Sequence, residues 1–190
     1  MHRFTSTVLG GLLALCAGAC GDDPVSYSAP VGIHLKAKSA NTANGVVSDE
    51  KSINTESGNP YGAFISDARG KLGRDPSVIE VERVELLLGA GSTGAATLGE
   101  VFAGAVDVLF QMNDTDTSYP VAESAISAST TAGPVAFDVR FVGNDVPDLD
   151  YVKLLGGSFK VVAHGPAAPT FMTKGADVDL QITFTFSAFE

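Results

Sequence analysis

Apolar and polar residues alternate along most of the chain after residue 30, which is the pattern of β-strands with one buried face. In residues 177–189, every second side chain from Val178 onward is apolar, and those between are mostly polar. The same alternation predicts strands over 31–38, 78–88, 106–112, 121–126, 135–142 and 159–163. Within residues 78–88 the apolar positions change parity near Glu82 and Arg83, which predicts a β-bulge.

Two stretches break the alternation. Residues 61–72 carry apolar side chains at approximately helical spacing, and Pro60 stands where a first helical turn tolerates proline, so a short helix is expected. Residues 39–60 are rich in Asn, Ser, Thr, Gly and charged side chains without any period. They are expected to form a long loop.

Several strands separated by turn-rich segments, with at most one or two short helices, favour an all-β fold of two packed antiparallel sheets. The expected architecture is a β-sandwich, immunoglobulin-like or jelly-roll-like. A small β-barrel is the alternative, because alternation does not say whether a sheet closes on itself. Residues 31–190, about 160 in number, are enough for a single core, so one domain is expected.

The N-terminus has a basic start that includes Arg3, followed by an apolar run from Val8 to Ala19 and then Cys20. The run is shorter than the roughly 20 apolar residues that a membrane span needs, which favours a cleaved signal. With small residues directly before Cys20, the segment resembles the lipobox of bacterial lipoproteins. An ordinary secretory signal cut near Ala19 is the alternative.

The resemblance to lipoproteins implies a signal peptide over residues 1–19 and a Cys20 that carries fatty acyl chains such as palmitate. Residues 20–30 would then form the lipidated cysteine and its tether. Stable anchoring normally needs two or more chains, which this modification would supply. Because Gly21 rather than Asp follows the cysteine, the resemblance favours the outer membrane over the inner membrane. Cys16 would leave with the signal, so the mature domain would hold no disulfide.

The chain carries a net charge of −10, and its Lys and Arg residues are not clustered. A nucleic-acid-binding surface needs a basic patch or stripe. Nucleic acid is therefore excluded as a partner.

Residues 89–94 fit the glycine pattern of dinucleotide-binding loops and follow an expected strand. That chemistry requires a parallel βαβ unit with a helix after the loop, and no such pattern surrounds these residues. The expected structure is a glycine-rich loop between strands.

A hydrolase would need a nucleophile with a histidine base. Ser92 resembles the serine of a nucleophile elbow, but Ala90 replaces the first required glycine. His34 and His164 are the two histidines that remain after processing, and a small hydrolase built on Ser92 and His164 is a minor alternative. Two histidines without a free cysteine do not make a zinc site.

Calcium is the one cofactor that the sequence leaves open. Two acidic segments lie between expected strands and offer the oxygen ligands that Ca²⁺ prefers. Their candidate ligands are Asp114, Asp116, Asp145, Asp148 and Asp150, beside Asn113 and Asn144. The alternative is that these Asn and Asp residues are ordinary turn formers.

With no convincing catalytic constellation, the expected function is that of a non-enzymatic, lipid-anchored envelope protein. Its partners would be the membrane, through acyl chains on Cys20, and an envelope protein or glycan bound by its loops. A Ca²⁺-stabilised adhesion-type module is the second hypothesis.

Overall fold

The computed structural model describes residues 25–115, 117–173 and 175–190. The strands are β1 (Ser26–Lys38), β2 (Val46–Ile53), β3 (Val78–Leu88), β4 (Gly104–Met112), β5 (Ser118–Ile126), β6 (Val135–Val139), β7 (Phe159–Pro166) and β8 (Asp177–Phe189). The helices are α1 (Pro60–Leu72), α2 (Asp148–Gly156) and α3 (Pro169–Thr173), with short 3-10 turns η1 (Ser39–Asn41), η2 (Leu98–Glu100) and η3 (Gly143–Asp145). The expectation of a mostly β fold is confirmed.

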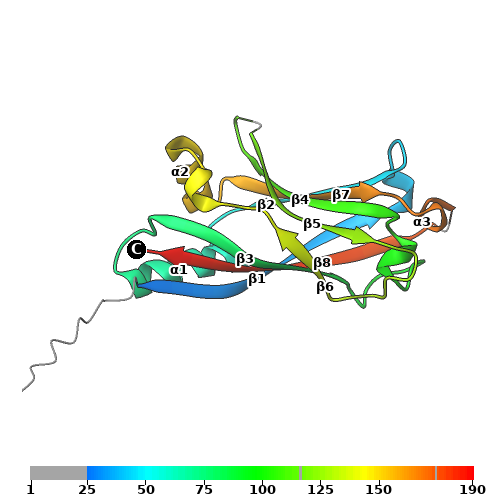
Figure 1. The fold of residues 1–190 in the computed structure, drawn as a ribbon, viewed down its shortest axis with the longest axis horizontal. Helices are drawn as coiled ribbons and strands as arrows, with labels where there is room; N and C mark the ends of the chain where they lie inside the picture. Colours follow the sequence, from blue (N-terminus) through cyan, green and yellow to red (C-terminus); the bar gives the residue numbers. More distant parts are fainter. Residues whose placement is uncertain (1–24, 116, 174) are drawn as a thin grey trace, which may run out of the picture.

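The eight strands form one sheet in the order β1-β8-β3-β6-β5-β4-β7-β2, and each pair is antiparallel (Figure 1). β6 joins the two halves, because it pairs with β3 on one side and with β5 on the other. The two separate sheets of a sandwich are therefore not seen. The barrel alternative fits the arrangement better.

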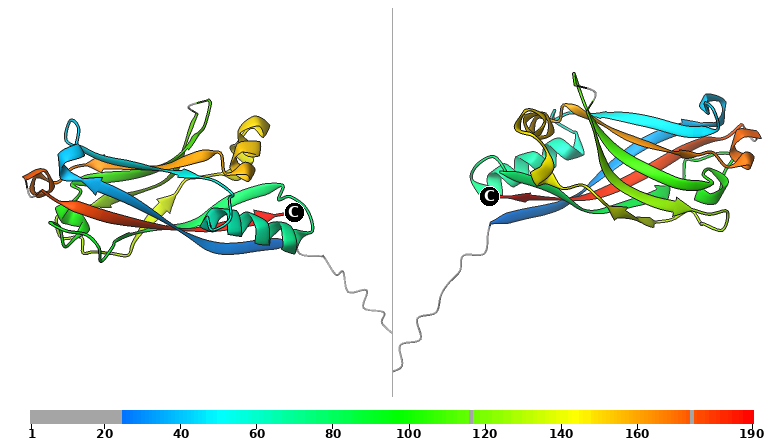
Figure 2. Two further views of the ribbon diagram at one scale, coloured as in Figure 1. Left: turned by 180° about the vertical axis from the view of Figure 1, so that it is seen from behind. Right: turned by 45° about the horizontal axis from the view of Figure 1, so that its top comes forward.

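The sheet curls until its two halves pack face to face (Figure 2). The ring centroid of Phe110 on β4 lies 5.7 Å from that of Phe184 and 6.1 Å from that of Phe186, both on β8. Three strands separate β4 from β8 in the sheet order, so these rings meet only because the sheet is strongly curved. The core consists of the apolar side chains that point inward from both halves.

The two edge strands, β1 and β2, face each other across a seam. The backbone N–H of Lys36 on β1 donates to Oδ2 of Asp49 on β2 at 2.7 Å. In the described parts of the chain no backbone pairing joins these two edges. The seam instead holds a hollow of about 210 Å³ between β1, β2 and the start of α1. The barrel is thus nearly closed, but no backbone ladder seals its last side in the described residues.

Helix α1 covers one end of the barrel. The side chain of Asn59 caps it by accepting from the N–H of Tyr61, and Pro60 occupies its first turn. The ring of Tyr61 lies 5.2 Å from the rings of both Phe159 and Phe186, so the helix reaches into the core. The expected helix over 61–72 is confirmed.

The β-bulge is also confirmed, because the pairing of β3 with β8 shifts register between Val81 and Arg83. The long loop expected over 39–60 is wrong in its middle, where β2 runs from Val46 to Ile53. Of the residues of β2, only Val47 and Ile53 are buried. An edge strand with so little buried surface leaves no clear alternation in the sequence.

Two further boundaries differ from expectation. β1 begins at Ser26 rather than at residue 31, so that part of the expected tether belongs to the sheet. Its first residues alternate between exposed and half-buried positions, which gives a weaker pattern than the buried positions from Val31 onward. The acidic segment expected to be a loop contains α2, whose only fully buried side chains are Asp150 and Leu154.

Candidate functional site

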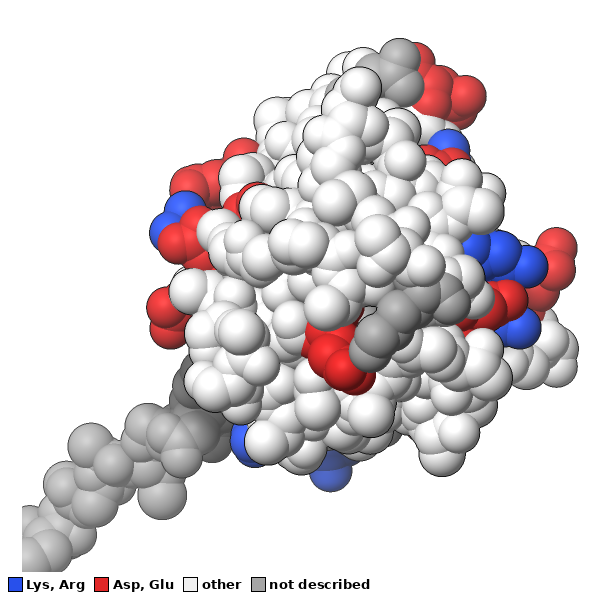
Figure 3. Space-filling view, turned by 90° about the vertical axis from the view of Figure 1, so that its right-hand side faces the viewer, with Lys and Arg blue, Asp and Glu red and all other residues white. Residues whose placement is uncertain are grey.

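A hollow on the described surface lies on the outer side of β1 and β8, toward the end of the barrel that carries α3. Its volume is about 450 Å³. We call it the His34 groove, and it is lined by His34, Lys36, Gly91, Thr93, Asp177, Val178 and Asp179. Figure 3 looks onto the α3 end of the molecule, where charged side chains gather mainly around the periphery.

Pairing between β1 and β8 builds one wall of the groove. Lys36 lies opposite Asp179, and His34 lies opposite Gln181, all with their side chains on the outer face of the sheet. Diagonal neighbours on one face of an antiparallel pair are within reach of long side chains. Accordingly, Nδ1 of His34 lies 3.1 Å from Oδ1 and 3.2 Å from Oδ2 of Asp179.

The carboxylate of Asp179 is fixed by hydrogen bonds from neighbouring side chains. Burial by itself would raise its pKa, but hydrogen bonds from Gln181 and His34, together with the electrostatic effect of the neighbouring His34 and Lys36, leave the pKa lowered. The Gln181 amide donates to Oδ2 at 3.0 Å. The His34 ring is 61% exposed and the Asp179 side chain 20% exposed, so the pair presents the imidazole to solvent.

The glycine-rich segment, residues 89–94, forms the other wall. β3 ends at Leu88, and the segment continues along β8 with the N–H of Gly89 donating to the Asp179 carbonyl. Thr93 exchanges both backbone hydrogen bonds with Asp177. A Cβ at Gly89 would lie 2.5 Å from the Asp179 carboxylate, which would have to shift. Gly94 has a φ of 78° and packs closely against the backbone of Ala176, whereas Gly91 faces open space. The loop expected from the sequence is confirmed.

Ser92 lies beside the groove, but its hydroxyl is bound to backbone. Its Oγ accepts from the N–H of Asp179 at 3.0 Å and lies 3.5 Å from the Asp179 carbonyl. His164, the expected partner, is on β7 with its Nε2 3.7 Å from Oδ2 of Asp107. The structure therefore does not bring this serine and this histidine into contact. The histidine near Ser92 is His34, and no hydrogen bond joins these two described residues.

The acidic segments expected to bind calcium meet at the opposite end of the barrel. Asp114 lies in the turn between β4 and β5 with a φ of 68°, Asp145 lies in η3, and Asp148 lies in the first turn of α2. Asp116 lies outside the described residues, as does Cys20. No group of three or more His, Cys, Asp or Glu side chains converges as metal ligands would among residues 25–115, 117–173 and 175–190.

Asp150 joins the two acidic segments through a hydrogen-bond network. Its Oδ2 accepts from the hydroxyl of Tyr119 at 2.7 Å, and its Oδ1 accepts from Nζ of Lys153 at 3.1 Å. Thr115 donates to the same carboxylate and accepts from Lys153. The ammonium group thus lies beside the Asp150 carboxylate and balances its charge.

The Asp150 network shifts two pKa values. The hydrogen bond from Tyr119 and the charge of Lys153 lower the pKa of Asp150, against the effect of burial. Burial and the hydrogen bond to Asp150 raise the pKa of Tyr119 to about 12. Both shifts favour the ionised carboxylate beside a neutral phenol, which is the arrangement of a structural network.

The sequence pattern indicated His34 and the glycine-rich loop as candidate site residues, but not Asp177 or Asp179. These carboxylates look like ordinary polar-face positions of a strand. Only the register between β1 and β8, which are far apart in the sequence, brings Asp179 to His34. The sequence carries no signal for that register, because alternation shows which face of a strand is buried but not which strand lies next to it.

No known family model matches the chain, and no curated protein matches it. None of the helices in the described part of the chain is long and apolar enough to cross a bilayer. The function is therefore inferred from this chain's own residues.

Proposed function

We propose that this chain is a lipid-anchored protein of the bacterial envelope whose barrel-like domain is a non-enzymatic binding module. Residues 1–19 are its signal peptide, Cys20 carries the acyl chains, and Gly21 directs it to the outer membrane. The His34 groove is the contact with its partner, an envelope protein or glycan.

The observation that carries the binding role is the arrangement of His34, Asp179 and Ser92. The His34 and Asp179 pair resembles the acid and base of a hydrolytic triad, in which the base must hold the hydroxyl of the nucleophile. Here the Ser92 hydroxyl is bonded to the Asp179 backbone instead. The groove is polar, and the serine hydroxyl beside it is bonded to backbone instead of to the histidine base that acyl transfer needs. This arrangement supports a binding role for the groove.

The chemistry of the groove defines the class of ligand. Lys36 and His34 supply hydrogen-bond donors, Asp177 and Asp179 supply carboxylate acceptors, and Thr93 supplies a hydroxyl. No aromatic side chain is among the described lining residues. Such a surface suits the hydroxyl groups of a glycan or the mixed charges of a protein loop, and does not suit an apolar ligand.

The position of the groove agrees with an anchored protein. The described chain begins at Val25, next to Glu190 at the end of the barrel that carries α1 and α2. Asp177, by contrast, begins β8 directly after α3 at the other end. A protein held at its N-terminus would therefore present the groove away from the membrane.

In-cell photocrosslinking of the full chain tests the groove. A photoreactive residue replaces Gly91, where an added Cβ would meet no atom within 4 Å. The same residue at Ser48, on the outer face of β2, serves as the control position. Mass spectrometry then identifies protein and glycan adducts. We expect an adduct specific to position 91.

A matched pair of variants decides whether the adduct depends on the groove. His34 with Asp179, and His164 with Asp107, are both cross-strand pairs of the same residue types, with the carboxylate of the first pair less exposed than that of the second. We expect D179N to reduce the adduct at position 91 by about tenfold, the effect of roughly 1.4 kcal/mol of lost binding, and D107N to leave it unchanged. Equal adducts at both positions, or equal loss in both variants, would contradict the proposed site.

A further inference from the structure

Large apolar side chains are exposed at the end of the barrel where the described chain begins. Leu149 and Val152 of α2 are 83% and 67% exposed, which makes them the most exposed large apolar residues in the described part of the chain. They are three positions apart, so they share one face of the helix. Val142 and Val25 are 48% and 41% exposed.

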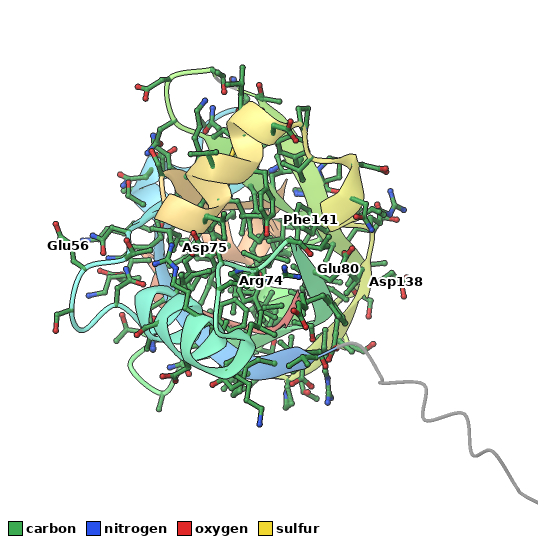
Figure 4. The ribbon with its side chains drawn as sticks, turned by 90° about the vertical axis from the view of Figure 1, so that its left-hand side faces the viewer. Glu56, Arg74, Asp75, Glu80, Asp138 and Phe141 are labelled. Carbon is green, nitrogen blue, oxygen red and sulfur yellow. The ribbon has the colours of Figure 1, made fainter. Side chains whose placement is uncertain are left out.

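Contacts between distant segments place these residues at the same end. Tyr151 of α2 donates to the Pro76 carbonyl at 2.8 Å, and the neighbouring Ser77 donates its N–H to the carbonyl of Phe189. The carbonyl of Val25 in turn accepts from the N–H of Glu190. Figure 4 looks onto this end, where α1 and α2 lie across the barrel with Arg74 and Asp75 between them. We call it the tether end.

The distance between Cys20 and the described domain is short. Val25 is five residues after Cys20, and five residues span at most about 18 Å in any conformation. The 13 residues of β1 by themselves run for about 44 Å along the barrel. A cysteine held at the bilayer surface therefore keeps the tether end close to that surface.

We propose that the tether end rests on the membrane that holds the acyl chains, with Leu149 and Val152 inserted among the lipid headgroups. This inference rests on the proposed lipid anchoring. α2 is suited to the position because its inward side chains, Asp150 and Leu154, attach it to the barrel and leave its apolar outer face free. An apolar helix face lying in the interface is a known mode of membrane contact.

The charges at the tether end are partly balanced by ion pairs. The net charge of the chain is negative, which opposes approach to anionic lipid. Two acidic groups of this end are nevertheless paired locally, Glu190 with Arg74 at 3.2 Å and Asp150 with Lys153 at 3.1 Å. Their ion pairs reduce the repulsion where the bilayer would lie, whereas the exposed Asp114, Asp145 and Asp148 add to it.

The absence of tryptophan from the chain allows a direct test with single-tryptophan variants of the full-length protein. L149W and V152W place the reporter on α2. M172W is the matched control, because Met172 is 47% exposed on α3 at the opposite end. Each acylated protein is reconstituted in vesicles of phosphatidylethanolamine and phosphatidylglycerol, with and without brominated acyl chains, which quench nearby tryptophan. Acylation of Cys20 is measured by mass spectrometry, and attachment by flotation.

We expect L149W and V152W to be quenched at least twofold by brominated lipid and to emit at shorter wavelength, while M172W is not quenched. An acylated, floating protein in which α2 and α3 reporters are quenched equally would overturn this inference and leave the anchor intact. A blue-shifted but unquenched L149W would assign the face to a protein contact instead. A chain without acyl groups would overturn the proposed anchoring and this inference together.

Discussion

Asp150 is a candidate ligand in the sequence and takes part in a hydrogen-bond network in the structure. In the sequence it belongs to an acidic segment with calcium-binding character. In the structure its carboxylate is almost buried and is held by Tyr119, Thr115 and Lys153. Removing one partner of a buried charged network leaves the other groups uncompensated, which makes such a residue important for stability.

We therefore expect D150N to lower the free energy of unfolding by about 2 kcal/mol, because Lys153 loses its partner in a poorly solvated position. Urea denaturation followed by circular dichroism measures this change. D148N is the matched control on the same helix, because its carboxylate is exposed and lies in the first turn. Its expected cost is about 0.5 kcal/mol. Equal losses in the two variants would contradict the role of the network.

The lowered pKa of Asp150 adds a pH dependence to this prediction. A carboxyl whose pKa is lower in the folded state stabilises the fold above its unfolded value of about 3.9, and loses that contribution as pH falls through the folded pKa. The difference in stability between the wild type and D150N is thus expected to be constant near neutral pH and to shrink below about pH 4. A difference that grew with acid would rule out this origin.

Among the elements, α1 shows how tightly a helix can be fitted to the barrel. Gly62 faces the backbone of Thr55, and a Cβ added there would lie 2.9 Å from three of its atoms. Gly70, two turns later on the same helix, is exposed and has no atom within 4 Å of such a Cβ. The same residue type therefore has a packing role at one position and none at the other.

Alanine at these two positions should have opposite effects. We expect G62A to lose about 2 kcal/mol of stability, because the contact with backbone cannot relax by a side-chain rotation. G70A should gain about 0.5 kcal/mol, since alanine favours a helix over glycine. Thermal unfolding of both variants compares them directly. A stabilised G62A would mean that α1 can move away from Thr55 at little cost.

At the scale of the whole molecule, the open question of the fold is why the barrel stops short of closing. Asp49, which is half-buried, and Lys51, which is exposed, lie between the buried Val47 and Ile53 on the same face of β2 by alternation. Charged side chains that point inward are a known means of protecting a sheet edge from pairing with another chain. Asp49 also binds the N–H of Lys36 on the facing edge. The seam is thus occupied by side chains where a closed barrel would have backbone pairs.

Replacing both charges with valine, in D49V with K51V, should remove this protection. We expect the variant to associate through its edges, which sedimentation equilibrium would detect as a higher average mass than that of the wild type at the same concentration. S48V with E50V is the control, because it adds two valines to the outer face of β2 and keeps the inward charges. Association in the control alone would show that added apolar surface, and not the edge, is responsible.

What the sequence determined by itself is local. The alternation of Val178 and its neighbours defines the faces of β8, the spacing after Pro60 defines α1, and the change of parity near Glu82 defines the bulge. Each of these depends on residues that are close along the chain. The same is true of the resemblance around Cys20, which is a property of a short segment.

The tertiary structure decided what depends on distant pairing. It closed the sheet toward a barrel, placed β2 at an edge with little buried surface, and set His34 beside Asp179 rather than Ser92 beside His164. A strand's pattern defines which face is buried but not which strand lies next to it, so neither the groove nor the Asp150 network was visible in the sequence. Those contacts arise only when segments far apart in the chain bury their apolar faces together.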